Sequence, residues 1–202
     1  MARDADIIRD NLRFGSVHLC VDMQNLFGAG SPWNVPWSEA ILPKIVSICE
    51  VCAEKTVFTR FIPPKNPGIA IGAWKKYYEK WESVTLDKID SRLVELADPL
   101  QRFVGRARVL DKSVYSPWTE GHLQRSLYKL RIRTLVVTGA ETDLCVLATV
   151  LGAVDRGYRV ILVKDAVCSS SDKTHDAALS LYHNRLSEQI TLISTDELLD
   201  AW

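Results

Sequence analysis

The segment GAETDLCV, residues 139–146, begins at the end of an apolar run typical of a buried strand, and it contains a cysteine thiol at position 145. Thr142 or Asp143 is suited to cap a following helix, which would put Cys145 in its first turn. The positive potential and free N–H groups of a helix N-terminus favour a thiolate and can hold an oxyanion. A thiol that only packs in the core would occupy the same position, so both interpretations stay open from position alone.

A cysteine nucleophile needs a base and a group that favours its anion. None of the four histidines ends a predicted strand, and His175, the one nearest such an end, fits more simply in the first turn of a capped helix. Charged residues that do end predicted strands are Asp22, Arg60, Lys112 and Asp165. Asp22 as base and Lys112 as stabilising cation are therefore the candidates, against a strand-ending cap and a solvated rim charge.

Strand-like and helical patterns alternate along the chain. The predicted strands are residues 17–23, 56–61, 107–112, 134–140, 158–166 and 189–194, and the predicted helices are residues 38–54, 87–103, 119–130, 143–156, 173–186 and 195–201. The β-branched, almost continuous apolar strands suit a sheet covered on both faces. We therefore expect a doubly wound α/β fold, a Rossmann-like three-layer sandwich around a central six-stranded, mainly parallel sheet. Ligands bind beyond the carboxyl ends of the strands in such sheets.

The composition restricts the class of protein. A chain of 202 residues, 47% hydrophobic and 25% charged, suits a single domain over residues 1–202. Lysine plus arginine equal aspartate plus glutamate, at 25 each, which predicts no nucleic-acid or anionic membrane partner. No stretch approaches about 18 consecutive apolar residues, and residues 1–16 lack the apolar core of a signal peptide. We expect a cytoplasmic protein with a small-molecule substrate.

The cysteines are few and scattered: Cys20, Cys49, Cys52, Cys145 and Cys168. An odd number in a chain of this length does not resemble a disulfide framework, which indicates thiols in a reducing compartment. Cys49 and Cys52 form a CxxC, a pattern found in zinc and redox sites, but the pair falls late in a helical pattern and is interpreted as core packing. Neither a Walker loop nor GxGxxG occurs, so the sequence predicts no nucleotide cofactor.

Three motifs, in order along nearly the whole chain, are similar to those of one family. They are D-M-Q-N-x-F beginning at Asp22, D-K-x-x-Y-S containing Lys112, and G-x-x-T-D-x-C-V containing Cys145. Together they resemble the isochorismatase-like cysteine hydrolases, a superfamily that includes nicotinamidases, N-carbamoylsarcosine amidases and isochorismatases. Each motif alone is a weak signal, whereas three in register are a strong one.

The resemblance implies an Asp-Lys-Cys triad. In it Asp22 takes the thiol proton, Lys112 supports the charged pair, and Cys145 attacks a carbonyl or similar carbon to form an acyl-thioester. It also implies an oxyanion hole made by the backbone N–H groups of Glu141 and Cys145, and a cis peptide between Ala140 and Glu141. Relatives of this kind are oligomers, so a homodimer or homotetramer is expected.

Departures from the family pattern narrow the predicted reaction. Nicotinamidases of this superfamily carry metal-binding histidines after the second strand, but TRFIPPKNPG, residues 59–68, contains none, so neither a metal nor another cofactor is expected. Members that cleave a vinyl ether can dispense with the cysteine, whereas Cys145 is present. We therefore predict a metal-independent hydrolase that cleaves a C–N bond of a small amide, ureido or carbamoyl substrate. The alternatives are a vinyl-ether hydrolase with Asp22 as acid, and a catalytically silent binding or assembly relative.

Aromatic residues near the predicted sheet edge suggest a largely apolar substrate pocket. The pocket candidates are Gln24, Phe27, Trp33, Phe61, Trp74, Tyr115 and Trp118. In AWKKYYEKW, four aromatic residues recur at helical spacing from Trp74 to Trp81. This stripe is interpreted as packing against the domain or a neighbouring subunit, with a lid over the substrate as the alternative.

Overall fold

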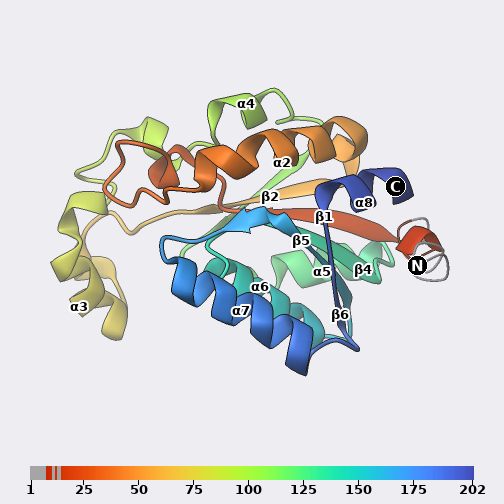
Figure 1. The fold of residues 1–202 in the computed structure, drawn as a ribbon. Coiled ribbons are helices and arrows are strands. Elements are labelled where there is room, and N and C mark those ends of the chain that lie inside the picture. The colour runs from red at the N-terminus through yellow and green to blue at the C-terminus, as the bar shows by residue number, and fades with distance from the viewer. Residues whose placement is uncertain (1–7, 11, 13–14) are drawn as a thin grey trace.

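The computed structural model describes residues 8–10, 12 and 15–202, and it contains one six-stranded sheet (Figure 1). The strands are β1 (Ser16–Val21), β2 (Thr56–Phe61), β3 (Arg108–Lys112), β4 (Thr134–Ala140), β5 (Arg159–Cys168) and β6 (Ile190–Ile193). Their order is β3-β2-β1-β4-β5-β6, and every pairing is parallel. The predicted doubly wound α/β fold and its strands are confirmed. The predicted absence of a signal peptide concerns residues 1–16, which lie largely outside the described residues.

Helices cover both faces of the sheet (Figure 1). One face carries α2 (Ser38–Cys52), α4 (Asp98–Gln101) and α8 (Thr195–Ala201), and the other carries α5 (His122–Lys129), α6 (Cys145–Val154) and α7 (Asp172–Arg185). Each face buries its own apolar layer, because consecutive side chains of a strand point to opposite sides. The helix α3 (Ala73–Lys80) lies apart from both layers, beyond the carboxyl ends of the strands.

The helix predicted over residues 87–103 is wrong. The structure has a 3₁₀ turn over Ser91–Val94 and the short α4, with extended backbone between them. There Ala97 N donates to Met23 O at 2.9 Å, so this segment runs alongside the loop that follows β1. Pro99 has no N–H to donate into a helix continuing from the preceding turn, which explains the break. The segment thus supports the loop beside the sheet edge.

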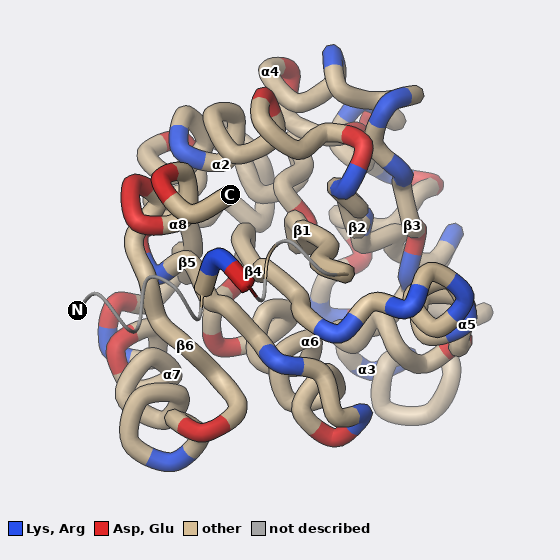
Figure 2. Tube along the Cα trace, turned by 90° about the vertical axis from the view of Figure 1, so that its right-hand side faces the viewer, with Lys and Arg blue, Asp and Glu red and all other residues tan. Residues whose placement is uncertain are grey.

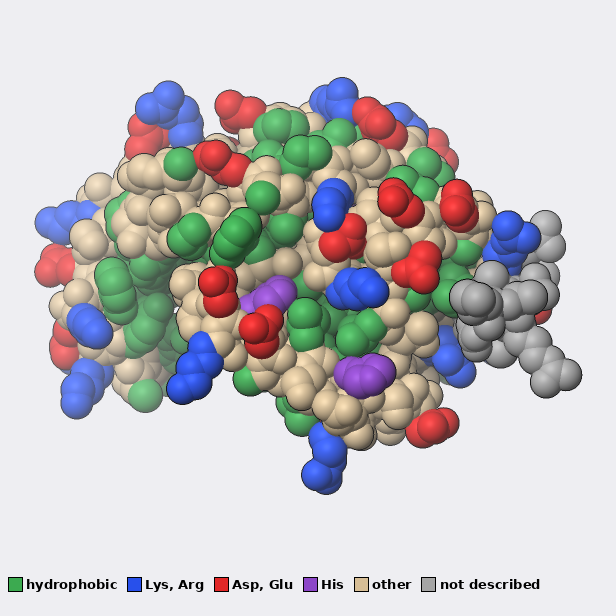
Figure 3. All heavy atoms as spheres, viewed as in Figure 1, with side chains coloured by type: hydrophobic (Ala, Val, Ile, Leu, Met, Phe, Trp, Pro, Cys, Tyr) green, Lys and Arg blue, Asp and Glu red, His purple; other side chains and the backbone are tan. Residues whose placement is uncertain are grey.

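Charged residues of both signs are distributed over the face of the molecule seen in Figure 2, in keeping with the equal numbers of acids and bases. Hydrophobic side chains gather in a recess beside α3 in the space-filling view (Figure 3). Within the described residues, no helix has both the length and the apolar character needed to cross a membrane.

Candidate active site

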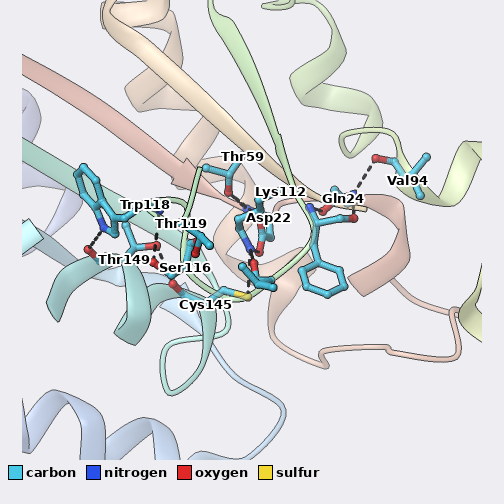
Figure 4. A network of polar contacts seen from close by, with 12 residues as sticks. Asp22, Gln24, Thr59, Val94, Lys112, Ser116, Trp118, Thr119, Cys145 and Thr149 are labelled. Atoms are coloured by element: carbon cyan, nitrogen blue, oxygen red, sulfur yellow. Dashed lines mark hydrogen bonds and ion pairs between the residues drawn. The ribbon is translucent and has the colours of Figure 1, made fainter. Parts of the chain in front are cut away.

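Three polar side chains meet at the carboxyl edge of the sheet. Asp22 directly follows β1, Lys112 is the last residue of β3, and Cys145 is the first residue of α6. The Lys112 ammonium donates to Asp22 Oδ2 at 2.6 Å and to Cys145 Sγ at 3.4 Å (Figure 4). Their exposed fractions are 0% for Asp22, 5% for Lys112 and 6% for Cys145. The structure therefore brings together the three residues that the sequence singled out.

Asp22 is held in an uncommon backbone conformation by a neighbour that the sequence analysis missed. Its φ of +50° lies in the left-handed region, which costs energy for a residue other than glycine. The Thr59 hydroxyl on β2 donates to Asp22 Oδ1 at 2.5 Å, and Asp22 N donates to the Thr59 carbonyl at 3.2 Å. Thr59 and Lys112 therefore engage one carboxylate oxygen each. A buried hydroxyl on the adjacent strand was the available signal.

Gly139 lets β4 approach the end of β1 closely. Its φ is +108°, and a Cβ atom there would lie 2.1 Å from the Val21 carbonyl oxygen. No other residue fits this combination of conformation and contact. The glycine therefore brings the turn that carries Cys145 beside the strand end that carries Asp22.

Burial controls the protonation of the site. It raises the pKa of Cys145 well above its ordinary value, and the nearby Asp22 carboxylate raises it further, against the opposing effect of Lys112. Burial by itself would lower the pKa of Lys112, but Asp22 and Cys145 together raise it. The resting site is thus an ion pair beside a protonated thiol. The thiolate expected at a helix N-terminus is not favoured, because the loss of solvation outweighs the helix potential.

The turn before α6 differs from the predicted capping pattern. The N-cap is Leu144, without a side-chain cap, and not Thr142 or Asp143. The Asp143 carboxylate instead accepts from the Ser169 hydroxyl, and the Thr142 hydroxyl lies 2.9 Å from His175 Nδ1. Both side chains therefore tie the turn to the segment that follows β5 and leave the start of α6 open.

Backbone donors are available in the same turn. The peptide bond between Ala140 and Glu141 is cis, the geometry that the resemblance implied. The Glu141 carbonyl accepts from Leu144 N at 3.1 Å and from Val146 N at 3.0 Å. The N–H groups of Glu141 and Cys145 donate to no acceptor among the described residues, so they remain free for a ligand.

A cavity of about 270 Å³ opens above Cys145. Its walls are largely aromatic, with Phe27, Trp33, Phe61, Tyr77, Trp81 and Tyr115. The remaining lining consists of Pro32, Asn34, Glu141, Leu144, Cys145 and Ser170. Four of the pocket candidates, namely Phe27, Trp33, Phe61 and Tyr115, therefore line this space.

Gln24 does not line the cavity, although the sequence analysis placed it there. Its amide Nε2 donates to the Phe61 carbonyl at 3.0 Å and to the Val94 carbonyl at 2.8 Å (Figure 4). Its Oε1 accepts from Phe61 N at 2.6 Å. The side chain is buried and connects the end of β2 to the 3₁₀ turn over Ser91–Val94, which is a structural role.

Trp118 is also outside the cavity. Its side chain is 3% exposed, and its indole Nε1 donates to the Thr149 carbonyl at 2.9 Å. A Cβ atom on Gly152 would lie only 2.3 Å from Trp118 Cδ1, so this glycine makes room for the indole ring. Trp118 therefore anchors α6, and this residue, a pocket candidate because of its place near the predicted sheet edge, packs in the core.

The aromatic stripe of α3 has a divided role. Tyr78 is buried, and Trp74 packs on Tyr115 with ring centroids 5.0 Å apart. Trp74 therefore supports a cavity wall from behind and is not itself part of the lining. Tyr77 and Trp81 do line the cavity and were missed as pocket residues. The periodicity predicted the helix, but it did not indicate which face is turned toward the cavity.

No metal site is apparent around this cavity. Within residues 8–10, 12 and 15–202, no group of three or more His, Cys, Asp or Glu side chains could hold a metal ion. The segment after β2 supplies no histidine either. The donors that the described residues place around the cavity therefore do not fit a metal ion.

The family model described as the isochorismatase domain matches residues 16–194, which include the whole sheet and all three triad candidates. The chain belongs to the isochorismatase family of hydrolases. It is 27% identical over 167 residues to nicotinamidase 3 of Arabidopsis thaliana, an alignment that covers 80% of this chain and 77% of that enzyme. It is 28% identical over 152 residues to an N-carbamoylsarcosine amidase of an Arthrobacter species.

The second alignment covers 73% of this chain but only 57% of the amidase, so the chain spans little more than half of that relative. Among solved structures, an isochorismatase family protein from Desulfovibrio vulgaris is similar to this one with a TM-score of 0.79. That match covers 93% of this chain and 97% of the other at 19% sequence identity. The likeness shows a common isochorismatase-family fold, and the resemblance drawn from the three motifs is confirmed.

Proposed function

We propose that this protein is a cysteine hydrolase that cleaves a C–N bond of a small amide, ureido or carbamoyl compound without a metal. The observation that carries the proposal is the Lys112 ammonium between Asp22 Oδ2, at 2.6 Å, and Cys145 Sγ, at 3.4 Å, on the floor of the cavity. A carboxylate, a cation and a thiol that share one buried contact are the parts that nucleophilic catalysis requires. Relatives named as a nicotinamidase and an N-carbamoylsarcosine amidase support an amide substrate.

In the first half of the reaction, Asp22 accepts the proton of the Cys145 thiol, and Sγ forms a bond to the substrate carbonyl carbon. Lys112 stabilises the charges on both partners during this transfer. The free N–H groups of Glu141 and Cys145 hold the oxyanion of the tetrahedral intermediate. Its collapse breaks the C–N bond, and the amine or ammonia leaves with the proton from Asp22.

In the second half, Asp22 takes a proton from water, and the resulting hydroxide attacks the thioester carbon. The C–S bond then breaks, the acid product leaves, and the sulfur recovers a proton from Asp22. The raised pKa of Cys145 agrees with this order of steps, because a thiol that is protonated at rest needs a base to remove its proton. Asp22 is that base, and the Lys112 ammonium contacts both Asp22 and Cys145.

The decisive test is hydrolysis of a panel of small amides, ureas and carbamoyl compounds, with mass spectrometry of the intact protein. We expect ammonia or amine release and an acyl adduct on the wild type, and neither on Cys145→Ala. Full hydrolysis by Cys145→Ala would overturn the nucleophile assignment. Vinyl-ether cleavage that persists without the thiol would instead identify Asp22 as an acid for that reaction. No turnover of any compound would favour a binding or assembly role.

A cytoplasmic location and a homodimer or homotetramer complete the proposal. Light scattering on the purified protein measures the oligomeric state directly, and a monomeric mass would contradict the oligomer.

A further inference from the structure

The described lining of the cavity carries a negative charge, although a buried lysine lies close by. Among the described residues that line it, Glu141 is the only one with a charged side chain, and none is Lys, Arg or His. Lys112 lies beneath the floor, where Asp22 and Cys145 occupy its ammonium. An anionic substrate would therefore meet a carboxylate on the wall without a free cation to pair with.

The Glu141 carboxylate is held at the cavity wall by the backbone. Its Oε1 accepts from Ser170 N at 3.0 Å, while Oε2 has no hydrogen-bond partner among the described residues. Because Glu141 also carries one of the free amides beside Cys145, its side chain starts next to the reacting centre. One oxygen is thus fixed, and the other is available to a ligand.

Six aromatic residues also line the cavity. Trp33 stacks on Phe27 with ring centroids 6.3 Å apart, and it meets Trp81 edge-to-face at 6.2 Å. Tyr77 and Phe61 also lie within 6.1 Å of the Trp33 ring. The negative face of an aromatic ring attracts cations, and cages of such rings bind quaternary ammonium groups. A carboxylate among these rings strengthens the preference for positive charge.

Two tyrosine hydroxyl groups share the cavity with Glu141. The pKa of Tyr77 is raised to about 12, first by burial and then by Tyr115, Glu141 and Cys145. The pKa of Tyr115 is also raised, first by burial and then by Cys145 and Glu141. Both tyrosines therefore stay neutral, which leaves Glu141 as the charged side chain among the described residues of the lining.

We propose that the substrate carries a cationic group, of the alkylammonium or pyridinium type, close to its scissile C–N bond, and that Glu141 and the aromatic wall recognise that group. The proposal rests on the proposed function for the bond that is broken, and it adds the charge of the substrate. Glu141 acts as a specificity residue through its side chain, apart from its backbone amide.

Binding of non-reactive probes tests the charge preference separately from catalysis. Phenyltrimethylammonium and benzenesulfonate are titrated into the wild type, and quenching of tryptophan fluorescence is followed because Trp33 and Trp81 line the cavity. We expect the cation to bind at least about tenfold more tightly than the anion. Glu141→Gln should weaken the cation about tenfold, whereas Glu188→Gln, the same change at an exposed site, should leave its Kd unchanged. Equal affinity for both probes would overturn the proposal.

Hydrolysis of matched amides tests the proposal in catalysis. The 1-methyl-3-carbamoylpyridinium cation, benzamide and 3-carbamoylbenzoate share a ring-bound carboxamide and differ in charge. We expect kcat/KM to fall in that order, and Glu141→Gln to reduce the ratio of cation to neutral substrate. Hydrolysis without any charge preference would overturn this proposal and leave the proposed function intact. Tight cation binding without hydrolysis would do the reverse.

Discussion

The two ends of β1 both hold a buried polar group beside a cysteine, yet only one end has the form of an active site. Near the start of the strand, His18 lies between Thr56 Oγ1 at 3.1 Å and Thr138 Oγ1 at 2.8 Å, with Cys49 Sγ at 4.0 Å. At its end, Asp22 meets Lys112 and Cys145. By residue type, a histidine beside a thiol is the more suggestive pair.

Access and unused hydrogen-bonding capacity distinguish the two ends. Both ring nitrogens of His18 are engaged, the side chain is fully buried, and burial lowers its pKa to about 3. Burial also raises the pKa of Cys49 to about 12, against smaller opposing effects of Thr56 and Arg102. Cys145 instead borders a cavity, and the N–H groups of Glu141 and Cys145 have no acceptor in the part of the chain that the structure describes. The two ends therefore differ in access to a cavity and in the hydrogen-bond donors that remain unused, and less in the residue types present.

The largest expected effect comes from removing the Lys112 cation at the Asp22 end of β1. Lys112→Met leaves the Asp22 carboxylate buried without its partner, so we expect kcat/KM to fall on the order of 10³-fold. The free energy of unfolding should fall by about 3–5 kcal/mol. Urea denaturation and steady-state kinetics measure the two quantities.

The double variant Asp22→Asn/Lys112→Met is the control, since it removes both charges together. It should regain much of the lost stability and remain inactive. Unchanged activity in Lys112→Met would show that the two ends of β1 differ less than their geometry implies.

Alkylation by iodoacetamide compares the thiols directly. Cys145 borders the cavity and should react at least about 100-fold faster than Cys49, which needs local unfolding. Because the pKa of Cys145 is raised, its rate should increase about tenfold per pH unit between pH 7 and 9. Peptide mapping by mass spectrometry gives both rates, and a plateau below pH 9 would contradict the protonated resting thiol.

Burial of His18, near the start of β1, should affect how the free energy of unfolding depends on pH. The unfolded chain protonates His18 near pH 6.5, but the folded protein resists protonation until about pH 3. The stabilisation is therefore present above pH 6.5 and is lost as the pH falls, by about 2 kcal/mol between pH 6.5 and 5. Denaturation across this range should show a flatter profile for His18→Gln, and equal slopes would refute the assignment.

The smallest effect is expected for Cys49, the thiol beside His18. Cys49→Ala removes one buried sulfur and should lower the free energy of unfolding by about 1–2 kcal/mol. The value of kcat/KM should stay that of the wild type, because Cys49 lies on α2 and is not among the residues that line the cavity above Cys145. A loss of activity comparable to that of Cys145→Ala would remove the distinction between the two thiols.

Several features of this protein could be predicted from local sequence. Apolar runs identified the strands, and the strand ends then identified Asp22, Lys112 and the turn of Cys145, because parallel strands share one carboxyl edge. The pocket was harder to predict. Trp118 fits a loop at that edge, but its indole turns into the core against Gly152, while Tyr77 and Trp81 point into the cavity from a helix that looked like packing.

The sequence by itself determined the alternation of strands and helices, the family, and which polar residues stand at the edge of the sheet, since these depend on local pattern and motif. Only the tertiary structure decided that the Lys112 ammonium lies between Asp22 and Cys145, that burial keeps the thiol protonated, and that Glu141 is the charged group on an aromatic wall. Side-chain direction, solvent access and electrostatic coupling arise between segments far apart in the chain, so they exist only once the fold has brought those segments together.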